Sequence, residues 1–169
     1  LKAEHEDRDE EDAAADSAQH FVQSLTLDCP HLWSHDAPRL HEAIVTVIDL
    51  DGTPLDTRCE KFGVRRISFS RSGGFVLNGL RVRLRGTNRH QEFPRVGYAA
   101  PRAAQYRDAR RIKEAGFDYV RLSHYPQSPD FLDACDELGL VVMTCIPGWQ
   151  FLGGERFRAQ VARRIRFAV

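Results

Sequence analysis

The 169-residue sequence contains no long hydrophobic run: every apolar stretch ends after a few residues, although 42% of the residues are hydrophobic. It therefore predicts no transmembrane helix, no secretory signal peptide and no membrane partner. The four cysteines lack C-x-x-C spacing and a paired histidine pattern, so we expect no zinc site and no other metal site in this chain. Free thiols in a reducing compartment fit this pattern, which favours a cytoplasmic over a secreted protein.

The sequence also lacks net charge, but its charges are unevenly distributed. Residues 1–16 hold eight acids against two bases, and we interpret residues 1–18 as a disordered acidic lead-in. Five arginines between residues 156 and 166 suggest a nucleic-acid contact, but Phe157 and Val161 recur beneath them at near-helical spacing. That stripe favours a solvated helix face and no nucleic-acid partner. The first residue is not methionine and the last helical segment lacks a cap residue, so we expect a fragment.

Short β-type runs separated by proline-containing loops occupy residues 19–65 and predict a segment of an antiparallel β-sandwich. The clearest runs are residues 21–27 and 43–48. Asp51-Gly52 is a strong turn signal, so the second run should form a hairpin with a strand through residues 57–62. Trp33 is expected in the sandwich core.

Beyond residue 63 the pattern changes to α/β. Asn78-Gly79 predicts a tight hairpin between residues 75–77 and 80–84. We then expect a helix from Pro101 to Gly116, a strand over 117–122, a helix to residue 138 and a fully buried parallel strand over 140–143. The first helix should bury five apolar side chains, which are Ala103, Ala104, Ala109, Ile112 and Ala115. Because a (β/α)8 TIM barrel needs about 250 residues, residues 66–169 can form only its N-terminal part.

Two polar segments mark a candidate site. Gly-Thr-Asn-Arg-His at residues 86–90 and Arg-Leu-Ser-His-Tyr-Pro at residues 121–126 each end a strand-like apolar run, with one helix-sized segment between them. A βαβ unit would bring both to the same carboxyl edge of a parallel sheet, where α/β folds place their active sites. His90, His124 and Arg121 are therefore candidate functional residues, although an ion pair of Arg121 with a nearby aspartate is a fair alternative.

Four motifs occur in one order along the chain: Phe62-Gly63-Val64-Arg65, Leu77-Asn78-Gly79, residues 84–90 and residues 121–126. From about residue 19 to the end, this set resembles glycoside hydrolase family two, which contains β-galactosidases, β-glucuronidases and β-mannosidases. The resemblance implies an immunoglobulin-like sandwich leading into a TIM barrel, and retaining hydrolysis of terminal β-linked sugars by two glutamates about 5 Å apart. It places both glutamates beyond Val169, so the chain alone should be inactive. The Asn-Arg-His form favours a β-galactosidase-like parent.

The resemblance also implies residue roles. His90 and His124 resemble donors to sugar hydroxyls, and Arg121 resembles the arginine that orients the nucleophile carboxylate. Asn88 is a candidate substrate contact, although it is interpreted, together with Arg89, mainly as shaping the strand end. Carbohydrate is the expected partner. The chain shows no cofactor site, and magnesium or a homo-oligomer is expected only of the full-length parent.

Several interpretations stay open. Trp149 suits a sugar-stacking platform and, equally, a cap on the barrel rim. Thr144-Cys145 stands where many family members carry an acidic pair. A non-catalytic carbohydrate-binding module, or a relic of a truncated gene, is the main alternative to an enzyme. An unrelated hydrolase using Glu92 or Asp136 is disfavoured, because these residues are expected in a loop and on a helix.

Overall fold

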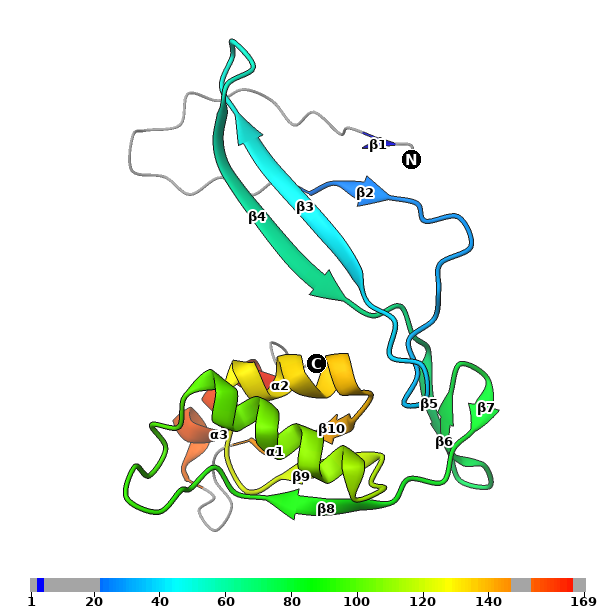
Figure 1. Ribbon diagram of the computed structural model, residues 1–169, viewed down its shortest axis with the longest axis vertical. Coiled ribbons are helices and arrows are strands. Elements are labelled where there is room, and N and C mark those ends of the chain that lie inside the picture. Colours follow the sequence, from blue (N-terminus) through cyan, green and yellow to red (C-terminus); the bar gives the residue numbers. More distant parts are fainter. Residues whose placement is uncertain (1–2, 5–21, 147–152, 166–169) are drawn as a thin grey trace. The chain divides into compact units, whose positions relative to one another are not determined.

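A computed structural model describes residues 3–4, 22–146 and 153–165 (Figure 1). The chain divides into two compact units, residues 1–30 and 31–169. The strands are β1 Ala3–Glu4, β2 Ser24–Leu25, β3 His41–Ile48, β4 Pro54–Phe62, β5 Ile67–Ser70, β6 Gly74–Leu77, β7 Leu80–Arg81, β8 Gly86–Arg89, β9 Tyr119–Leu122 and β10 Val141–Met143. The helices are α1 Arg102–Glu114, α2 Pro129–Leu138 and α3 Glu155–Ile165. No helix in the described ranges is long and apolar enough to cross a membrane.

The first unit contains one short antiparallel pair, in which Ala3 of β1 lies opposite Leu25 of β2. The strand expected over residues 21–27 is wrong in length, because only Ser24–Leu25 pairs. Residues 22–29 are exposed, so this segment gains little burial that would extend the strand. Most of the acidic lead-in lies outside the described residues, and its predicted disorder and 1–18 boundary stay a prediction.

The predicted hairpin in the second unit is confirmed. β3 pairs antiparallel with β4, starting from His41 opposite Phe62. In the turn, the Asp51 carboxylate accepts the N–H of Thr53. Hydrogen bonding from the side chain of Thr53, and then from its backbone, lowers the pKa of Asp51. Gly52 takes the positive φ of +86° that the turn requires. β3 and β4 form a two-stranded sheet with mostly exposed side chains. The β-sandwich over residues 19–65 stays a prediction.

The predicted Asn78-Gly79 turn is also confirmed. Both residues have positive φ, +53° and +83°, as a type I′ turn requires. Asn78 does more than turn the chain: its side chain accepts the N–H of Arg66 and donates to the backbone oxygen of Trp33, both at 2.9 Å. The turn therefore joins the small sheet of β5, β6 and β7 to the segment around Trp33.

The strand predicted over residues 80–84 is wrong in length, because β7 ends at Arg81. The first parallel strand, β8, is the polar motif itself rather than an apolar run before it. Gly86 allows this arrangement, since a Cβ there would collide with the side chain and backbone of Tyr119 in the next strand. The motif thus supplies both a strand and, at its end, the candidate residue His90.

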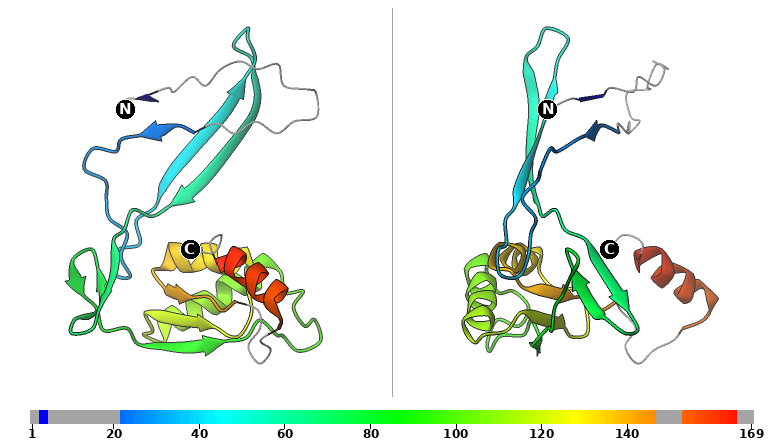
Figure 2. Two further views of the ribbon diagram at one scale, coloured as in Figure 1. Left: turned by 180° about the vertical axis from the view of Figure 1, so that it is seen from behind. Right: turned by 90° about the vertical axis from the view of Figure 1, so that its right-hand side faces the viewer.

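The predicted βαβ succession is confirmed. β8, β9 and β10 form a parallel sheet in the order β10-β9-β8, with α1 and α2 as the crossovers (Figure 1). Figures 1 and 2 show α1 and α2 side by side on one face of this sheet, and α3 beyond its other face. Parallel strands end at one edge, so residues that follow β8 and β9 are brought together there.

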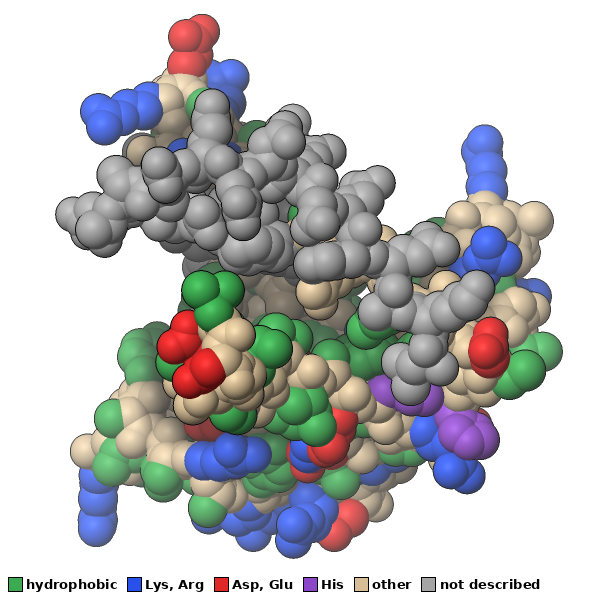
Figure 3. Space-filling model, turned by 90° about the horizontal axis from the view of Figure 1, so that it is seen from above, with side chains coloured by type: hydrophobic (Ala, Val, Ile, Leu, Met, Phe, Trp, Pro, Cys, Tyr) green, Lys and Arg blue, Asp and Glu red, His purple; other side chains and the backbone are tan. Residues whose placement is uncertain are grey.

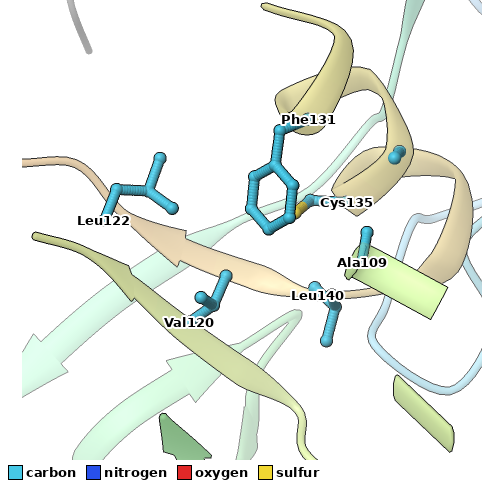
Figure 4. Packing of buried hydrophobic residues seen from close by; sticks show 7 residues of the cluster. Ala109, Val120, Leu122, Phe131, Cys135 and Leu140 are labelled. Carbon is cyan, nitrogen blue, oxygen red and sulfur yellow. The ribbon is translucent and has the colours of Figure 1, made fainter. Parts of the chain in front are cut away.

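One hydrophobic core lies between this sheet and the helices α1 and α2. Side chains of β9 point toward α2 and pack with residues of α1 and of the entry to β10 (Figure 4). Seven residues are almost fully buried: Ala109, Val120, Leu122, Phe131, Ala134, Cys135 and Leu140. Because side chains alternate along a strand, this packing leaves Tyr119 and Arg121 on the other face of the sheet.

Two burial predictions for this layer are wrong. Ala103 and Ala115, near the ends of α1, are exposed, whereas the polar Gln105 is fully buried. α1 turns Gln105 inward because its side-chain oxygen accepts a hydrogen bond from Arg89. β10 is only partly buried, with Met143 50% exposed, since within the described residues it pairs with β9 alone.

Trp33 is buried as predicted, but its partners lie in α2 rather than in a sandwich core. The indole is 1% exposed and donates from Nε1 to the backbone oxygen of Asp136 at 2.7 Å. The Arg65 guanidinium lies 4.5 Å from the indole centroid, and a Cβ at Gly63 would press on the indole. These contacts attach the segments flanking the hairpin to the α/β layer.

The remaining composition-based predictions can be compared directly with the structure. All four cysteines are free thiols, as expected. In α3, Arg156 and Arg158 are exposed while Phe157 and Val161 are half-buried, as expected for an amphipathic helix, and the absence of a nucleic-acid partner stays a prediction. Figure 3 shows acidic and basic side chains interspersed with hydrophobic ones on the face seen there. No single sign of charge covers that face.

Candidate active site

The two histidines singled out in the sequence lie together. Arg89, the last residue of β8, pairs with Leu122 of β9, so His90 and His124 both follow the carboxyl edge. Their ring centroids are 5.6 Å apart, and the planes meet edge-to-face at 81°. His90 is exposed and His124 is half-buried. The pair forms one polar surface at the edge where the α/β fold was expected to carry its site.

The pKa of His124 lies below its ordinary value. Burial is the main cause, followed by the positive charge of Arg121 and the proximity of His90. All three effects penalise the imidazolium form. His124 is therefore neutral near pH 7, and a neutral imidazole can donate one hydrogen bond and accept another.

Arg121 lies on the face of the sheet opposite the hydrophobic core. In the strand register it stands beside Asn88 of β8 and Met143 of β10. Its guanidinium donates to the hydroxyl of the buried Ser123 at 3.1 Å. Asn88 is exposed. The structure thus places Arg121 and Asn88 on one face, directly below the histidine edge.

The alternative for Arg121, a structural ion pair with Asp118 or Asp108, is wrong. Asp118 lies 3.9 Å from the side chain of Arg85, and Asp108 lies 3.1 Å from that of Arg89. Among the described residues, no carboxylate lies within 4.0 Å of the Arg121 guanidinium.

Aromatic rings extend the histidine pair along the edge. The Tyr125 ring centroid is 6.0 Å from that of His90, and the Tyr98 ring centroid is 5.4 Å from that of Tyr125. The Tyr98 hydroxyl donates to the Glu92 carboxylate at 2.7 Å, which raises the pKa of Tyr98. Four rings thus form a row along the edge. The sequence analysis did not single out Tyr98, because it lies in a loop with no periodic pattern.

Gln91 ties the two loops of the site together. Its backbone N–H donates to the Tyr125 hydroxyl at 2.9 Å, and its side-chain oxygen accepts the N–H of Ser128 at the start of α2. The structure shows a neutral amide used as a connector.

Arg89 points to the helix side of the sheet and is 6% exposed. Its guanidinium donates to Gln127, to Gln105 at 2.7 Å and to Asp108 at 3.1 Å, and it lies 3.9 Å from the ring centroid of Phe131. Burial lowers the pKa of Arg89, and the Asp108 carboxylate opposes that effect. Sequence analysis missed Gln105 and Gln127, since no local pattern links residues so far apart.

Other candidate residues are placed less decisively. Thr144 is exposed and Cys145 half-buried after β10, at the edge where an acidic pair is common in relatives. Trp149 lies outside the described residues, and its role stays a prediction. In the described ranges, no group of three or more His, Cys, Asp or Glu side chains could hold a metal ion.

The hydrolase that would use Glu92 and Asp136 is not supported. Glu92 follows the carboxyl end of β8, whereas Asp136 lies in the last turn of α2, which leads into the amino end of β10. The two carboxylates therefore belong to opposite edges of the sheet. Asp136 instead lines a cavity of about 230 Å³ beside Lys61 and Glu137. Burial raises the pKa of Asp136.

Comparison with known proteins agrees with this geometry. The model of the glycosyl hydrolases family 2 TIM barrel domain matches residues 70–158, more than half of the chain, and the family 2 model named glycosyl hydrolases family 2 matches residues 1–65. The chain belongs to glycosyl hydrolase family 2. Its α/β layer is therefore part of a TIM barrel, as the sequence predicted.

The family 2 relatives are much longer than this chain. A β-galactosidase of Thermoanaerobacter pseudethanolicus is 45% identical over 82% of this chain and 19% of its own length. A putative β-glucuronidase of Formosa agariphila is 41% identical over 70% of this chain and 14% of its own. The apo structure of Bacteroides uniformis β-glucuronidase 3 superposes with a TM-score of 0.73 at 40% identity, covering 88% of this chain and 19% of that one. The chain thus spans between 14% and 19% of the length of these relatives.

Proposed function

We propose that this chain supplies the sugar-binding part of the site of a retaining exo-β-glycosidase, and that terminal β-galactosides are its substrates. The observation that carries this proposal is the meeting of His90 and His124 at one sheet edge, with Arg121 on the face below. The β-galactoside assignment is supported by the Asn-Arg-His motif and by β-galactosidase relatives such as that of Thermoanaerobacter pseudethanolicus.

The proposed chemistry divides between binding and bond cleavage. The imidazoles of His90 and His124 would hydrogen-bond sugar hydroxyls and strengthen those bonds as the ring flattens toward the oxocarbenium-like transition state. The guanidinium of Arg121 would hold the nucleophile carboxylate ionised by charge pairing. None of the strands β8, β9 and β10 is followed directly by a glutamate. We propose that both catalytic glutamates belong to another part of the longer protein, and that this chain alone is inactive.

Other features of the full-length protein follow as parts of the same proposal. The β3–β4 hairpin would belong to an immunoglobulin-like sandwich, and Trp149 would stack on a sugar ring. In the described ranges no group of three or more His, Cys, Asp or Glu side chains could hold a metal ion, and we propose magnesium only as a ligand of the full-length parent. Carbohydrate is the proposed partner, and homo-oligomerisation is a property of the parent to be measured.

A β-glucuronidase is the second candidate. It is supported by the 41% identical putative β-glucuronidase and by the B. uniformis structure. A glucuronide carries a carboxylate that a galactoside lacks, so this activity needs an additional cation or hydrogen-bond donor at the sugar C6 position.

The test is a panel of chromogenic glycosides assayed on the full-length protein. The proposal expects hydrolysis of a β-galactoside, little hydrolysis of an α-galactoside, and a first product with retained β configuration by NMR. The 169-residue chain should show no activity. Preferential cleavage of a β-glucuronide would select the second candidate, and no β-glycosidase activity in the full-length protein would favour the non-catalytic alternative.

A further inference from the structure

Arg89 and Gln127 bind each other in both directions. The guanidinium Nη1 of Arg89 donates to the side-chain oxygen of Gln127, and the side-chain Nε2 of Gln127 donates to the backbone oxygen of Arg89 at 2.7 Å. The same backbone oxygen also accepts the N–H of Ser123 at 3.0 Å. Arg89 immediately precedes His90, and Gln127 lies three residues after His124. This reciprocal pair therefore joins the two loops that carry the histidines.

The Arg89–Gln127 pair is buried among side chains of α1 and α2, which we call the frame. Gln127 is 8% exposed, and Gln105 of α1, which accepts from the same guanidinium, is fully buried. Phe131 of α2 packs against the guanidinium face. A planar guanidinium with several fixed donors can meet these partners at the same time, which an ammonium cannot. The frame thus fixes the end of β8 relative to α1 and to the loop before α2.

Burial of this guanidinium has a cost. The Arg89 Nε atom is buried and has no hydrogen-bond partner in the described part of the chain, and such an unsatisfied donor lowers stability. An apolar residue in the same place would avoid that cost. What an apolar residue could not do is hold both loops by directional hydrogen bonds.

The geometry points to Arg89 and Gln127 as positioning residues that set the separation of the His90 and His124 rings. The effect on catalysis rests on the proposed function, in which both imidazoles contact the sugar. Gln91, through Tyr125 and Ser128, closes the same two loops on the outer side. Loss of the inner pair leaves that outer connection and the bond from the Ser123 N–H to the Arg89 backbone oxygen, so we expect the spacing of the two imidazoles to change.

The test uses the full-length protein and a matched pair of conservative variants. Arg89→Lys keeps the positive charge opposite Asp108 but loses the planar guanidinium with its several donors. The control, Arg85→Lys, makes the same change at a largely exposed arginine just before β8. We expect Arg89→Lys to lower kcat/KM by about 10²-fold, the loss a displacement of about 1 Å can cause, with most of the loss in kcat. Arg85→Lys should change kcat/KM less than about twofold, as a surface substitution does.

A second experiment, in a protein that lacks both histidine side chains, distinguishes a positioning role of Arg89 from a general contribution to stability. In a protein that already carries His90→Ala and His124→Ala, Arg89→Lys should cost less than about threefold, because a positioning residue acts through the groups it positions. An equal loss in both backgrounds would overturn the proposal. Gln127→Met, which removes both side-chain bonds, replaces Arg89→Lys if that variant does not fold.

A structural measurement keeps this inference separate from the proposed function. Crystal structures of the parent and of Arg89→Lys should show the ring separation near 5.6 Å in the parent and a displaced His124 in the variant. An unchanged separation refutes the positioning role even if the protein is an active glycosidase. If the protein cleaves no glycoside, the proposed function fails while a displaced His124 still supports the positioning role.

Discussion

Gly139 and Gly116 offer a matched test of whether the segment around His35 packs against the end of α2. Gly139 follows α2 and Gly116 follows α1, and their φ values, +76° and +83°, are nearly the same. A Cβ at Gly116 would meet nothing within 4 Å, whereas a Cβ at Gly139 would collide with the backbone oxygen of His35. Replacing each with alanine therefore imposes the same backbone penalty, and only Gly139→Ala also displaces a neighbouring segment.

The expected magnitudes follow from these contacts. The left-handed conformation costs a residue with a Cβ about 1–2 kcal/mol, which is the whole expected effect of Gly116→Ala. At Gly139 the displacement also disturbs Lys113, whose ammonium donates to the backbone oxygens of His35 at 2.7 Å and of Gly139 at 2.9 Å. Hydrogen bonds to a charged group contribute about 1.5–3 kcal/mol, so Gly139→Ala should cost about 3–5 kcal/mol in all.

Urea unfolding of the chain, followed by far-UV circular dichroism, measures this difference. Gly139→Ala should lower the free energy of unfolding by about 2–3 kcal/mol more than Gly116→Ala, or leave the chain unfolded without urea. Equal losses for the two variants would refute the reasoning, since they would mean that the segment around His35 does not pack against the end of α2.

Three further predictions use titratable groups. Burial raises the pKa of the Cys135 thiol, so iodoacetamide should alkylate the exposed Cys59 in the native chain but Cys135 only after denaturation, as peptide mass spectrometry would show. The pKa of His124 should lie below 6.5 and rise in Arg121→Met, which removes one of the causes of its depression; an NMR titration showing no rise would contradict this. The pKa of Asp136 is raised, so the folded chain binds its proton more tightly and loses stability as the pH rises above the unfolded value near 3.8. Asp136→Asn should therefore stabilise the chain at pH 7 but not at pH 3, as thermal unfolding at both pH values would test.

Turns and element order could be predicted from the sequence because their causes are local. Asn78-Gly79 and Asp51-Gly52 carry the backbone preferences of their own turns. Pro129 starts α2 and Gly139 ends it at a left-handed φ, again for reasons contained in a few neighbouring residues. The placement of His90 and His124 after the same sheet edge could be predicted from the element order, since a βαβ unit has only one carboxyl edge.

Predictions failed where the burial of a residue depends on partners that are distant in the sequence. Gln105 is buried along with Ala109, whereas Ala103 and Ala115 are exposed, because the Gln105 side chain accepts a hydrogen bond from Arg89, sixteen residues earlier. Trp33 packs on α2, and its indole bonds a backbone oxygen 103 residues away. β10 is partly exposed because burial of a strand depends on both neighbours, and the described residues provide one. None of these partners leaves a periodic signal in the sequence around the residue it controls.

The parallel register alone does not bring the histidines together. Because Arg89 stands beside Leu122, the residue level with His90 is Ser123, and His124 lies one position further along its loop. That loop must turn back for the two rings to come within 5.6 Å, and three hydrogen-bonded connections hold it there, from Gln91 to Tyr125, from Gln91 to Ser128 and between Arg89 and Gln127. Strand pairing therefore brings His90 and His124 to within one residue of the same level, and these hydrogen bonds hold the loop that carries His124. Substitutions at these connecting residues should alter sugar recognition without touching the sugar.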